Sequence, residues 1–225
     1  MKKKYVVLIV LLFILVVVII NIPQKESNEK LLGIDYDVKG NEVNLKYNTE
    51  NPVVAMNIEN YGSIVMELYP DIAPNTVNNF ISLIKSGFYD NNTMHRLMKD
   101  FVLQGGDPTG TGSGGPGYTI GGEFTSNGFE NSLSHEKWVV SMARTKDNPN
   151  SAGSQFFICL EDSVFLDGDY AAFGKIIDGF DVIEEIEENE EVSNSDSGKL
   201  SRNLVIEKAL IDLQGKKYEK AIKYS

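Results

Sequence analysis

Three side chains with distinct chemistry lie within nine residues: the guanidinium of Arg96, the ring of Phe101 and the carboxamide of Gln104. A guanidinium is always charged and only donates hydrogen bonds. A guanidinium beside an aromatic ring can bind, without a covalent bond, a ligand in which a polar group stands next to an apolar group. The chain has no G-x-S-x-G motif and no pairing of a nucleophile with a base, so covalent catalysis is not indicated.

Two short strands position these residues. Apolar residues on both sides of Lys99-Asp100 indicate two strands that meet at a turn. Because alternate residues share a face and paired strands face each other, we expect Arg96 to lie near Phe101 or Gln104. In a second stretch Gln155 and Phe157 stand two apart, which places them on one face of a further strand.

No cofactor or metal is expected. The segment 110–115 matches G-x-G-x-x-G, but Pro116-Gly117 follows where a dinucleotide site needs a helix, so we expect a mobile loop beside the site. His95 and His135, the only histidines, lack metal-ligand spacing. Strict alternation turns His95 away from Arg96 and makes it structural, and a local hydrogen bond is expected for His135.

Several separated motifs agree in order and spacing with one family. They are His95-Arg96, Phe101 to Asp107, Ser141 to Ala143, Gly153 to Ile158, Phe165 to Gly168 and Phe173 to Lys175. Together they make the chain, from about Pro52 to Leu213, resemble the cyclophilin family of peptidyl-prolyl cis/trans isomerases, in a bacterial-like, membrane-anchored form. Any one motif alone, such as Gln-Gly-Gly, is weak.

The pattern of elements indicates an all-β domain. It predicts a hairpin of 53–58 with 63–68, a helix starting at Pro74, a helix over 180–188 and a closing strand over 204–213, with no βαβ alternation. This predicts an antiparallel barrel or sandwich. The resemblance implies a closed eight-stranded antiparallel β-barrel capped by two helices, with the active site on the outer wall.

The resemblance also implies the site. Arg96, Phe101 and Gln104 are the expected catalytic residues. The expected substrate-binding residues are Val102, Ala143, Arg144, Gln155, Phe157, Phe165, Leu166 and Tyr170. Phe101, Phe157 and Leu166 form the proline pocket, Val102 its rim, and Ala143, Arg144 and Gln155 hold the peptide backbone. Arg96 stabilises the twisted amide, whose nitrogen gains a lone pair, over both planar forms.

Four positions depart from the best-known family pattern. Val102 replaces Met, Arg144 replaces Asn, Phe165 replaces Trp and Tyr170 replaces His. Phe165 lacks the indole N–H that commonly donates to cyclosporin, and losing that bond costs about 1–3 kcal/mol. We therefore expect weak cyclosporin binding. Trp138, the only tryptophan, has no explanation from the sequence.

The N-terminus carries a membrane signal. Lys2, Lys3 and Lys4 precede an unbroken apolar run from Tyr5 to Ile20, which with its edges approaches the ~20 residues that span a bilayer. The lysines predict a cytoplasmic N-terminus, a single-pass anchor in the cell membrane and a catalytic domain on the extracytoplasmic side. Cleavage of the segment and secretion is the alternative, although no small-residue cleavage site follows the run.

We therefore expect an anchor or signal segment over 1–22, a linker over 23–50, the isomerase domain over 51–214 and a tail over 215–225. Gln214 to Ser225 is expected to form a short basic helix. The net charge is −11 and, without the three lysines, −14, which argues against a nucleic-acid partner. The expected function is isomerisation of X-Pro bonds in exported, proline-containing polypeptides by a monomer. The alternative is a proline-peptide binding chaperone or scaffold with little turnover.

Overall fold

A computed structural model describes residues 27–31, 34–39 and 42–225. The expected anchor over 1–22 lies outside the described residues. Within the described part, no helix is long and apolar enough to cross a membrane.

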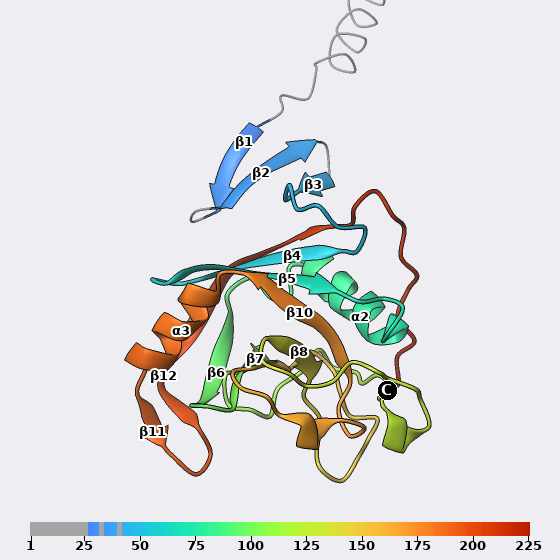
Figure 1. The fold of residues 1–225 in the computed structure, drawn as a ribbon, viewed down its shortest axis with the longest axis vertical. Helices are drawn as coiled ribbons and strands as arrows, with labels where there is room; N and C mark the ends of the chain where they lie inside the picture. Colours follow the sequence, from blue (N-terminus) through green and yellow to red (C-terminus); the bar gives the residue numbers. More distant parts are fainter. Residues whose placement is uncertain (1–26, 32–33, 40–41) are drawn as a thin grey trace, which may run out of the picture.

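Eight antiparallel strands close into a barrel (Figure 1). They are β4 (Val53–Ile58), β5 (Gly62–Leu68), β6 (Asn92–Met98), β7 (Val102–Asp107), β8 (Val139–Met142), β9 (Phe156–Cys159), β10 (Ala172–Asp178) and β12 (Lys199–Asp212). Their order is β12-β4-β5-β10-β8-β9-β7-β6, and β12 also pairs with β6, which closes the ring. A short strand, β11 (Val192–Asn194), extends β12 as a hairpin. The predicted closed eight-stranded antiparallel barrel is confirmed.

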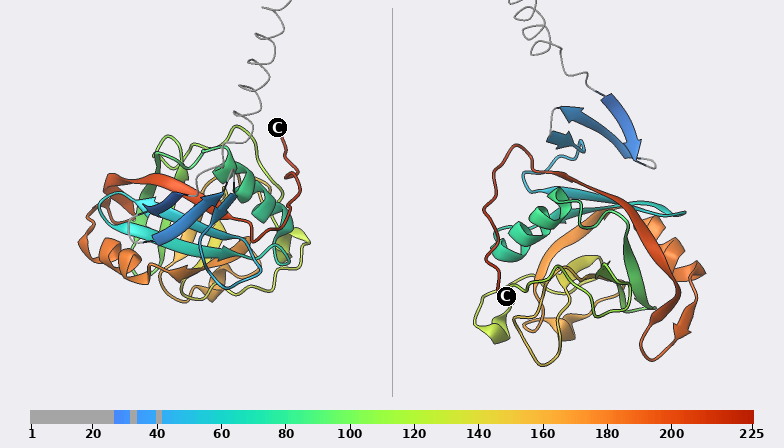
Figure 2. Two further views of the ribbon diagram at one scale, coloured as in Figure 1. Left: turned by 90° about the horizontal axis from the view of Figure 1, so that it is seen from above. Right: turned by 180° about the vertical axis from the view of Figure 1, so that it is seen from behind.

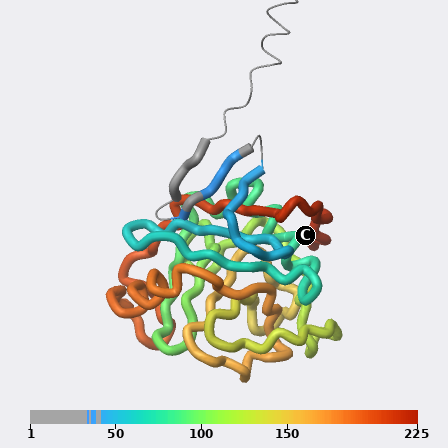
Figure 3. Tube along the Cα trace, turned by 45° about the horizontal axis from the view of Figure 1, so that its top comes forward, coloured from blue at the N-terminus to red at the C-terminus, as the bar shows by residue number. Residues whose placement is uncertain are grey.

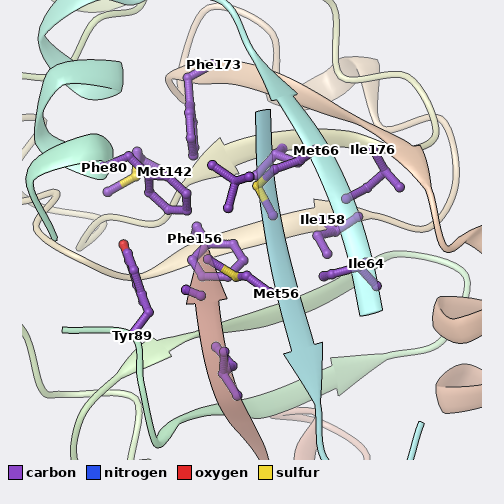
Figure 4. Packing of buried hydrophobic residues seen from close by; sticks show 14 of the residues in the cluster. Met56, Ile64, Met66, Phe80, Tyr89, Met142, Phe156, Ile158, Phe173 and Ile176 are labelled. Carbon is purple, nitrogen blue, oxygen red and sulfur yellow. The ribbon is translucent and has the colours of Figure 1, made fainter. Parts of the chain in front are cut away.

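The barrel interior is filled with side chains (Figure 4). Phe80 packs against three other buried rings, with its ring centroid 4.9 Å from that of Tyr89, 5.4 Å from Phe156 and 5.0 Å from Phe173. Aromatic pairs at these distances add to the stabilisation that burial supplies. A packed interior leaves no room for a substrate, so any site must lie outside it.

Two helices cover the barrel at opposite sides in Figure 1. Helix α2 (Pro74–Lys85) begins at Pro74, which costs no hydrogen bond in the first turn, and Glu123 accepts from the backbone N–H groups of Asn75 and Thr76 at 2.9 and 2.7 Å. Helix α3 (Phe180–Asn189) turns Ile183 and Ile186 into the interior. Single 3₁₀ turns form at η1 (Thr125–Asn127) and η2 (Val164–Leu166). The two predicted helices are confirmed.

A small antiparallel sheet precedes the barrel, formed by β1 (Ser27–Leu31), β2 (Ile34–Lys39) and β3 (Glu42–Asn44). The sheet lies on the outside of the barrel (Figure 3), and Tyr36 of β2 and Leu45 after β3 form a buried cluster with Val53, Ala55 and Val65. The sequence predicts a linker over 23–50, whereas Tyr36, Val43 and Leu45 within this range pack on the barrel. Strand β4 is apolar at nearly every position because both of its faces are buried.

The tail after β12 is extended, so the expected basic helix over 214–225 is wrong. The chain runs along α2 and ends beside the loop that contains Thr119 (Figure 2). Trp138 precedes β8 with a φ of 76°; its N–H donates to Cys159 and its carbonyl accepts from Ile176. Its ring packs on Phe180, at 5.3 Å between centroids, so it seals the barrel at the start of α3.

Candidate active site

One row of residues crosses four strands on the outer wall of the barrel. Arg96 on β6 is paired with Gln104 on β7, Gln104 with Phe157 on β9, and Phe157 with Ser141 on β8. Residues in register across a sheet lie side by side on one face. The predicted proximity of Arg96 and Gln104 is confirmed, and Phe157 joins them.

A chain of hydrogen bonds fixes the polar part of the row. Arg96 Nη1 donates to Gln104 Oε1 at 3.0 Å, and Gln104 Nε2 donates to Gln155 Oε1 at 3.0 Å. Gln155 Nε2 then donates to the carbonyls of Gly112 and Gly114 at 3.0 and 2.9 Å. Each amide is oriented by its neighbours, so the network presents the guanidinium in one orientation.

Arg96 is held at three points. Besides Gln104, Nε donates to the carbonyl of Ser197 at 2.8 Å, and Nη2 contacts the sulfur of Met98. A guanidinium has five N–H groups, so two stay available for a ligand. Burial lowers the pKa of Arg96, yet an arginine starts so far above neutrality that it stays charged.

Asp107 organises the glycine-rich loop that ends the network. The fully buried carboxylate accepts from Thr109, Thr111, Gly112 and Gly114. Burial opposes its ionisation, but hydrogen bonds, led by those from Gly114 and Thr109, outweigh this and lower the pKa of Asp107 to about 2. Segment 110–115 is therefore tied to β7 at its start and to Gln155 at its end.

An apolar cluster on the same outer wall lies next to the network. We call it the outer-wall cluster; it consists of Val102, Phe157, Cys159 and Leu166, with Met98, Phe101, Ala143 and Tyr170 packed against it. Phe157 and Leu166 keep only 5% and 8% of their surface exposed. Phe101, Phe157 and Leu166, expected to bind proline, are thus in one group, with Val102 among them. Burial raises the pKa of the Cys159 thiol to about 12, which makes it inert.

Aromatic residues border this cluster. Phe165 is 70% exposed and its ring stacks on Phe101, with 5.6 Å between centroids. Tyr170 meets Phe157 edge-on at 5.7 Å and carries the guanidinium of Arg144 at 4.8 Å. Arg144 donates to the backbone carbonyls of Asp169, Thr145 and Lys146, so most of its donors serve the protein itself. The backbone N–H of Ala143 donates to the carbonyl of Gln155, which joins the two segments.

His135 supports the cluster from behind. Its ring lies nearly parallel to that of Phe157 at 6.1 Å, with Nδ1 2.8 Å from Asp167 and Nε2 3.0 Å from Ser141. Burial lowers the pKa of His135 although Asp167 acts in the opposite direction. The expected local hydrogen bond is present, but the stacking on Phe157 has no signal in the sequence.

His95 does not follow the expected alternation. The register between β6 and β7 shifts between Met94 and Arg96, and both Met94 and Leu97 lie in the interior. The imidazole is buried, and its Nε2 lies 3.9 Å from the place where a Cβ on Gly112 would stand. His95 therefore packs under the glycine-rich loop. Among the residues that the structure describes, no three His, Cys, Asp or Glu side chains gather as a metal site needs.

Comparison with known proteins agrees with this geometry. Residues 53–211 match the model of the family described as cyclophilin type peptidyl-prolyl cis-trans isomerase/CLD. Peptidyl-prolyl cis-trans isomerase-like 1 of Rhizopus delemar is 46% identical over 54% of this chain and 72% of its own length, and peptidyl-prolyl cis-trans isomerase B of Bacillus subtilis is 45% identical over 55% and 82%. A crystal structure of a cyclophilin type isomerase of Cryptosporidium parvum, in the presence of the dipeptide Ala-Pro, matches with a TM-score of 0.63 and 36% identity over 71% of this chain and 98% of that one. The chain therefore belongs to the cyclophilin family of peptidyl-prolyl cis-trans isomerases.

Proposed function

We propose that Arg96 accelerates rotation about X-Pro bonds in exported polypeptides by stabilising the twisted amide, while the outer-wall cluster holds the proline ring. One observation carries this assignment. A guanidinium fixed at three points keeps two donors available directly beside an apolar cluster on the outer wall.

The chemistry requires no bond to form or break. Amide rotation meets a barrier of ~18–20 kcal/mol because the C–N bond is partly double. Twisting restores a lone pair on the prolyl nitrogen, and a cationic donor aimed there stabilises the twisted state alone. Arg96 is suited to this because it donates, stays charged and never accepts.

Arg96 does not supply the whole effect. An acceleration of ~10⁵ needs about 7 kcal/mol, whereas one charge-assisted hydrogen bond contributes about 1.5–3 kcal/mol. The remainder is assigned to preorganisation. The side-chain carbonyl of Gln104 accepts from the guanidinium of Arg96, and the amide group of Gln104 donates to Gln155. The guanidinium is thus already oriented, so little reorientation accompanies the twist of the peptide bond. Gln104 retains one N–H to hold a peptide carbonyl.

The test is a cis-to-trans isomerisation assay on an X-Pro peptide with three proteins. Arg96→Ala should lower kcat/KM at least tenfold, and Arg96→Lys should restore only part of it, because an ammonium cannot keep the contacts to Ser197 and Gln104 together. Circular dichroism verifies that the variants are folded. Normal turnover by a folded Arg96→Ala protein overturns the mechanism. Peptide binding by the wild type without turnover points to the binding chaperone instead.

Export of the substrates is proposed from the N-terminal sequence. Three lysines before the apolar run from Tyr5 to Ile20 orient the domain to the extracytoplasmic side of the cell membrane. Only residues 21–26 separate this run from β1, and six residues span at most about 20 Å. An uncleaved anchor would thus hold the barrel close to the membrane.

Protease added to intact cells should remove the domain. Protection of the domain until the membrane is breached reverses the proposed topology. Recovery of a mature protein that begins after residue 22 establishes cleavage and secretion instead of anchoring.

A further inference from the structure

The guanidinium of Arg96 is held by two separate parts of the chain. Gln104, its neighbour across the sheet, accepts from Nη1, and the carbonyl of Ser197, 101 positions further along the chain, accepts from Nε at 2.8 Å. Ser197 lies in the turn that joins β11 to β12, in a hairpin that extends beyond α3 (Figure 1). We call residues 192–200 the β11–β12 hairpin. Because a guanidinium is planar, bonds at two of its nitrogens fix the direction in which its other N–H groups face.

The backbone of this hairpin is bonded directly to β6. The carbonyl of Gly198 accepts from the N–H of Leu97 at 2.8 Å. The carbonyls of Ser197 and Gly198 thus bind consecutive residues of β6, the first through the side chain of Arg96 and the second through the backbone. Leu200 anchors the base of the hairpin in the core, where it is 2% exposed. The acceptor for Nε is therefore placed by the fold of the backbone.

Asn194 keeps the turn of the hairpin in shape. Its Oδ1 accepts from the N–H of Ser197 at 2.9 Å, and its carbonyl accepts from the N–H of Gly198 at 2.9 Å. These two N–H groups flank the Ser197 carbonyl, so both peptide units around the acceptor are bonded to Asn194. Residues 193–197 are all exposed, so hydrogen bonds and not packed side chains hold the carbonyl in place.

Gly198 allows the hairpin to approach β6 closely. Its φ is 69°, in the left-handed region that favours glycine. A Cβ there would stand 2.5 Å from Cγ of Met98 and 2.8 Å from the carbonyl oxygen of Leu97, closer than packed atoms come. Met98 also contacts Nη2 of Arg96 through its sulfur. A side chain at position 198 would therefore displace both the Ser197 carbonyl and Met98, two of the three groups that hold the guanidinium.

We propose that the β11–β12 hairpin positions the cation of the isomerase, through the Ser197 carbonyl, with Asn194 and Gly198 as positioning residues. The proposal rests on the proposed function, because it takes Arg96 as the donor to the twisted amide. Since that donor acts in the twisted state and not in the planar ones, the hairpin should govern kcat and leave KM nearly unchanged.

The first measurement separates kcat from KM for an X-Pro peptide, by NMR line-shape analysis over a range of peptide concentrations. Gly198→Ala should lower kcat about 5- to 20-fold with KM within about twofold, because it displaces two contacts of Arg96. Asn194→Ala removes the side-chain bond to Ser197 and leaves the backbone unstrained, so the test does not depend on the folding of Gly198→Ala. It should lower kcat about 2- to 5-fold, and Asn194→Asp, which keeps an acceptor oxygen, should restore it.

Each substitution has a matched control elsewhere in the chain. Gly215 has a φ of 68°, and nothing lies within 4 Å of the place of its Cβ, so Gly215→Ala introduces the same backbone strain without a collision. Asn44 Oδ1 accepts from the N–H of Lys46 at 2.9 Å, so Asn44→Ala removes the same kind of bond from the N-terminal sheet. Both controls should retain the wild-type kcat and KM.

A double-mutant cycle with Arg96 distinguishes positioning from a general structural role. In the Arg96→Ala background no guanidinium remains to be oriented, so Gly198→Ala should cause no further loss of kcat. A loss of the same size in both backgrounds would show that the hairpin supports the site as a whole, and it would overturn the proposal.

Hydrogen exchange at Nε of Arg96 measures the bond itself, without turnover. The chain has three arginines, and the Nε–H signal that disappears in Arg96→Lys belongs to Arg96. In Gly198→Ala this N–H should exchange with water at least about fivefold faster than in wild type. The Nε–H of Arg144, which donates to the carbonyl of Asp169 at 2.9 Å, should exchange at an unchanged rate.

The outcomes separate the two proposals. If Arg96→Ala retains turnover, the proposed function fails and this inference fails with it. If Arg96→Ala is impaired but Gly198→Ala and Asn194→Ala both retain the wild-type kcat, the hairpin does not position the cation. The same conclusion follows if kcat falls in Gly198→Ala while the Arg96 Nε–H exchanges at its wild-type rate.

Discussion

The barrel carries two apolar surfaces on its outside, and only one of them is covered by the N-terminal segment of the chain. One, the N-terminal patch, joins Val53, Ala55 and Val65 of the barrel to Tyr36 and Leu45, and the strands β1–β3 lie over it. The other is the outer-wall cluster around Val102 and Phe157, which borders Arg96 and Gln104. Both arise from the same alternation, because strands of a closed barrel expose every second residue outward.

Polar groups at the two surfaces are used in different ways. Around the N-terminal patch they fasten the covering segment: Leu45 N–H donates to Asp212 at 3.0 Å, and Tyr47 donates to Asp178 at 2.6 Å. Beside the outer-wall cluster they hold one another, from Asp107 through Gln155 to Arg96, and leave donors of Arg96 available. The apolar surface that the chain itself covers contributes to stability, and the one left beside an anchored cation is the proposed proline site.

Truncation within the N-terminal patch should affect stability alone and gives the largest effect. Leu45 is 2% exposed, so Leu45→Ala should destabilise the packing of β1–β3 by about 2–4 kcal/mol, through lost contacts and the cavity left behind. Limited proteolysis between residues 27 and 50 measures this, with Glu42→Ala, an exposed residue of β3, as control. Turnover should stay within twofold. A large loss of activity in the folded variant would show that the two surfaces are coupled.

The opposite result is expected at the outer-wall cluster. Phe101→Ala removes a ring that borders the proposed proline site and should lower kcat/KM by about 10- to 100-fold, or about 1.4–2.7 kcal/mol. Its loss of stability should be smaller, because the ring is only partly buried. Phe180→Ala, a partly exposed ring packed on Trp138 at the start of α3, is the matched control and should leave turnover unchanged. Equal loss of activity in both variants would contradict a local role for Phe101.

The sequence predicts the outer wall better than the surfaces that cover the barrel. Alternation within short strands places Arg96 beside Gln104, and it places Gln155 on the same face as Phe157. Both predictions depend only on residues that are neighbours along one strand or one hairpin. The bulge before Arg96 breaks that rule, which is why His95 lies under the glycine-rich loop. A one-residue shift in strand register turns the following side chains to the other face of the sheet, and the apolar periodicity of the sequence does not reveal such a shift.

Long-range pairing explains the other differences. Strands β2 and β3 contain several polar residues, yet their apolar side chains pack on Val53, Ala55 and Val65, and this contact cannot be read from their own pattern. The tail is basic and suits a helix locally, yet its backbone bonds to Thr119 and Asn75 hold it extended. Local propensity is a weak prior where such contacts decide.

The hydrogen-bonded network predicts a pH dependence that the N-terminal patch does not share. The pKa of Asp107 is lowered to about 2, so its contribution to stability is complete above its unfolded pKa near 4 and is lost as the pH falls from about 4 to about 2. Asp107→Asn should therefore lower the free energy of unfolding by roughly 1–2 kcal/mol at pH 7, and the difference from wild type should vanish near pH 2. Urea unfolding followed by the fluorescence of Trp138, the only tryptophan, measures it.

Other groups titrate in a separate range. Burial lowers the pKa values of His95 and His135. Wild type and Asp107→Asn therefore both lose stability as the pH falls below about 6.5, the unfolded pKa of histidine. This loss cancels in the comparison of wild type with Asp107→Asn. A difference between the two proteins that is constant from pH 7 to pH 2 would show that the carboxylate charge is not what folds the glycine-rich loop.

The smallest effect concerns the rim of the outer-wall cluster and its response to cyclosporin. By family resemblance an indole at the position of Phe165 donates to the drug, and a phenyl ring cannot. Phe165 stacks on Phe101 but is 70% exposed, so a hydrogen bond formed there competes with water and contributes about 0.5–1.5 kcal/mol. Phe165→Trp should thus tighten inhibition by about 2- to 12-fold, while turnover of an X-Pro peptide stays near wild type because Phe157 and Leu166 are unchanged. Drug titration of both proteins measures the shift, with Val164→Trp, which adds an indole at the neighbouring exposed residue, as control. Equal and tight inhibition of wild type and Phe165→Trp would show that residue 165 does not determine sensitivity.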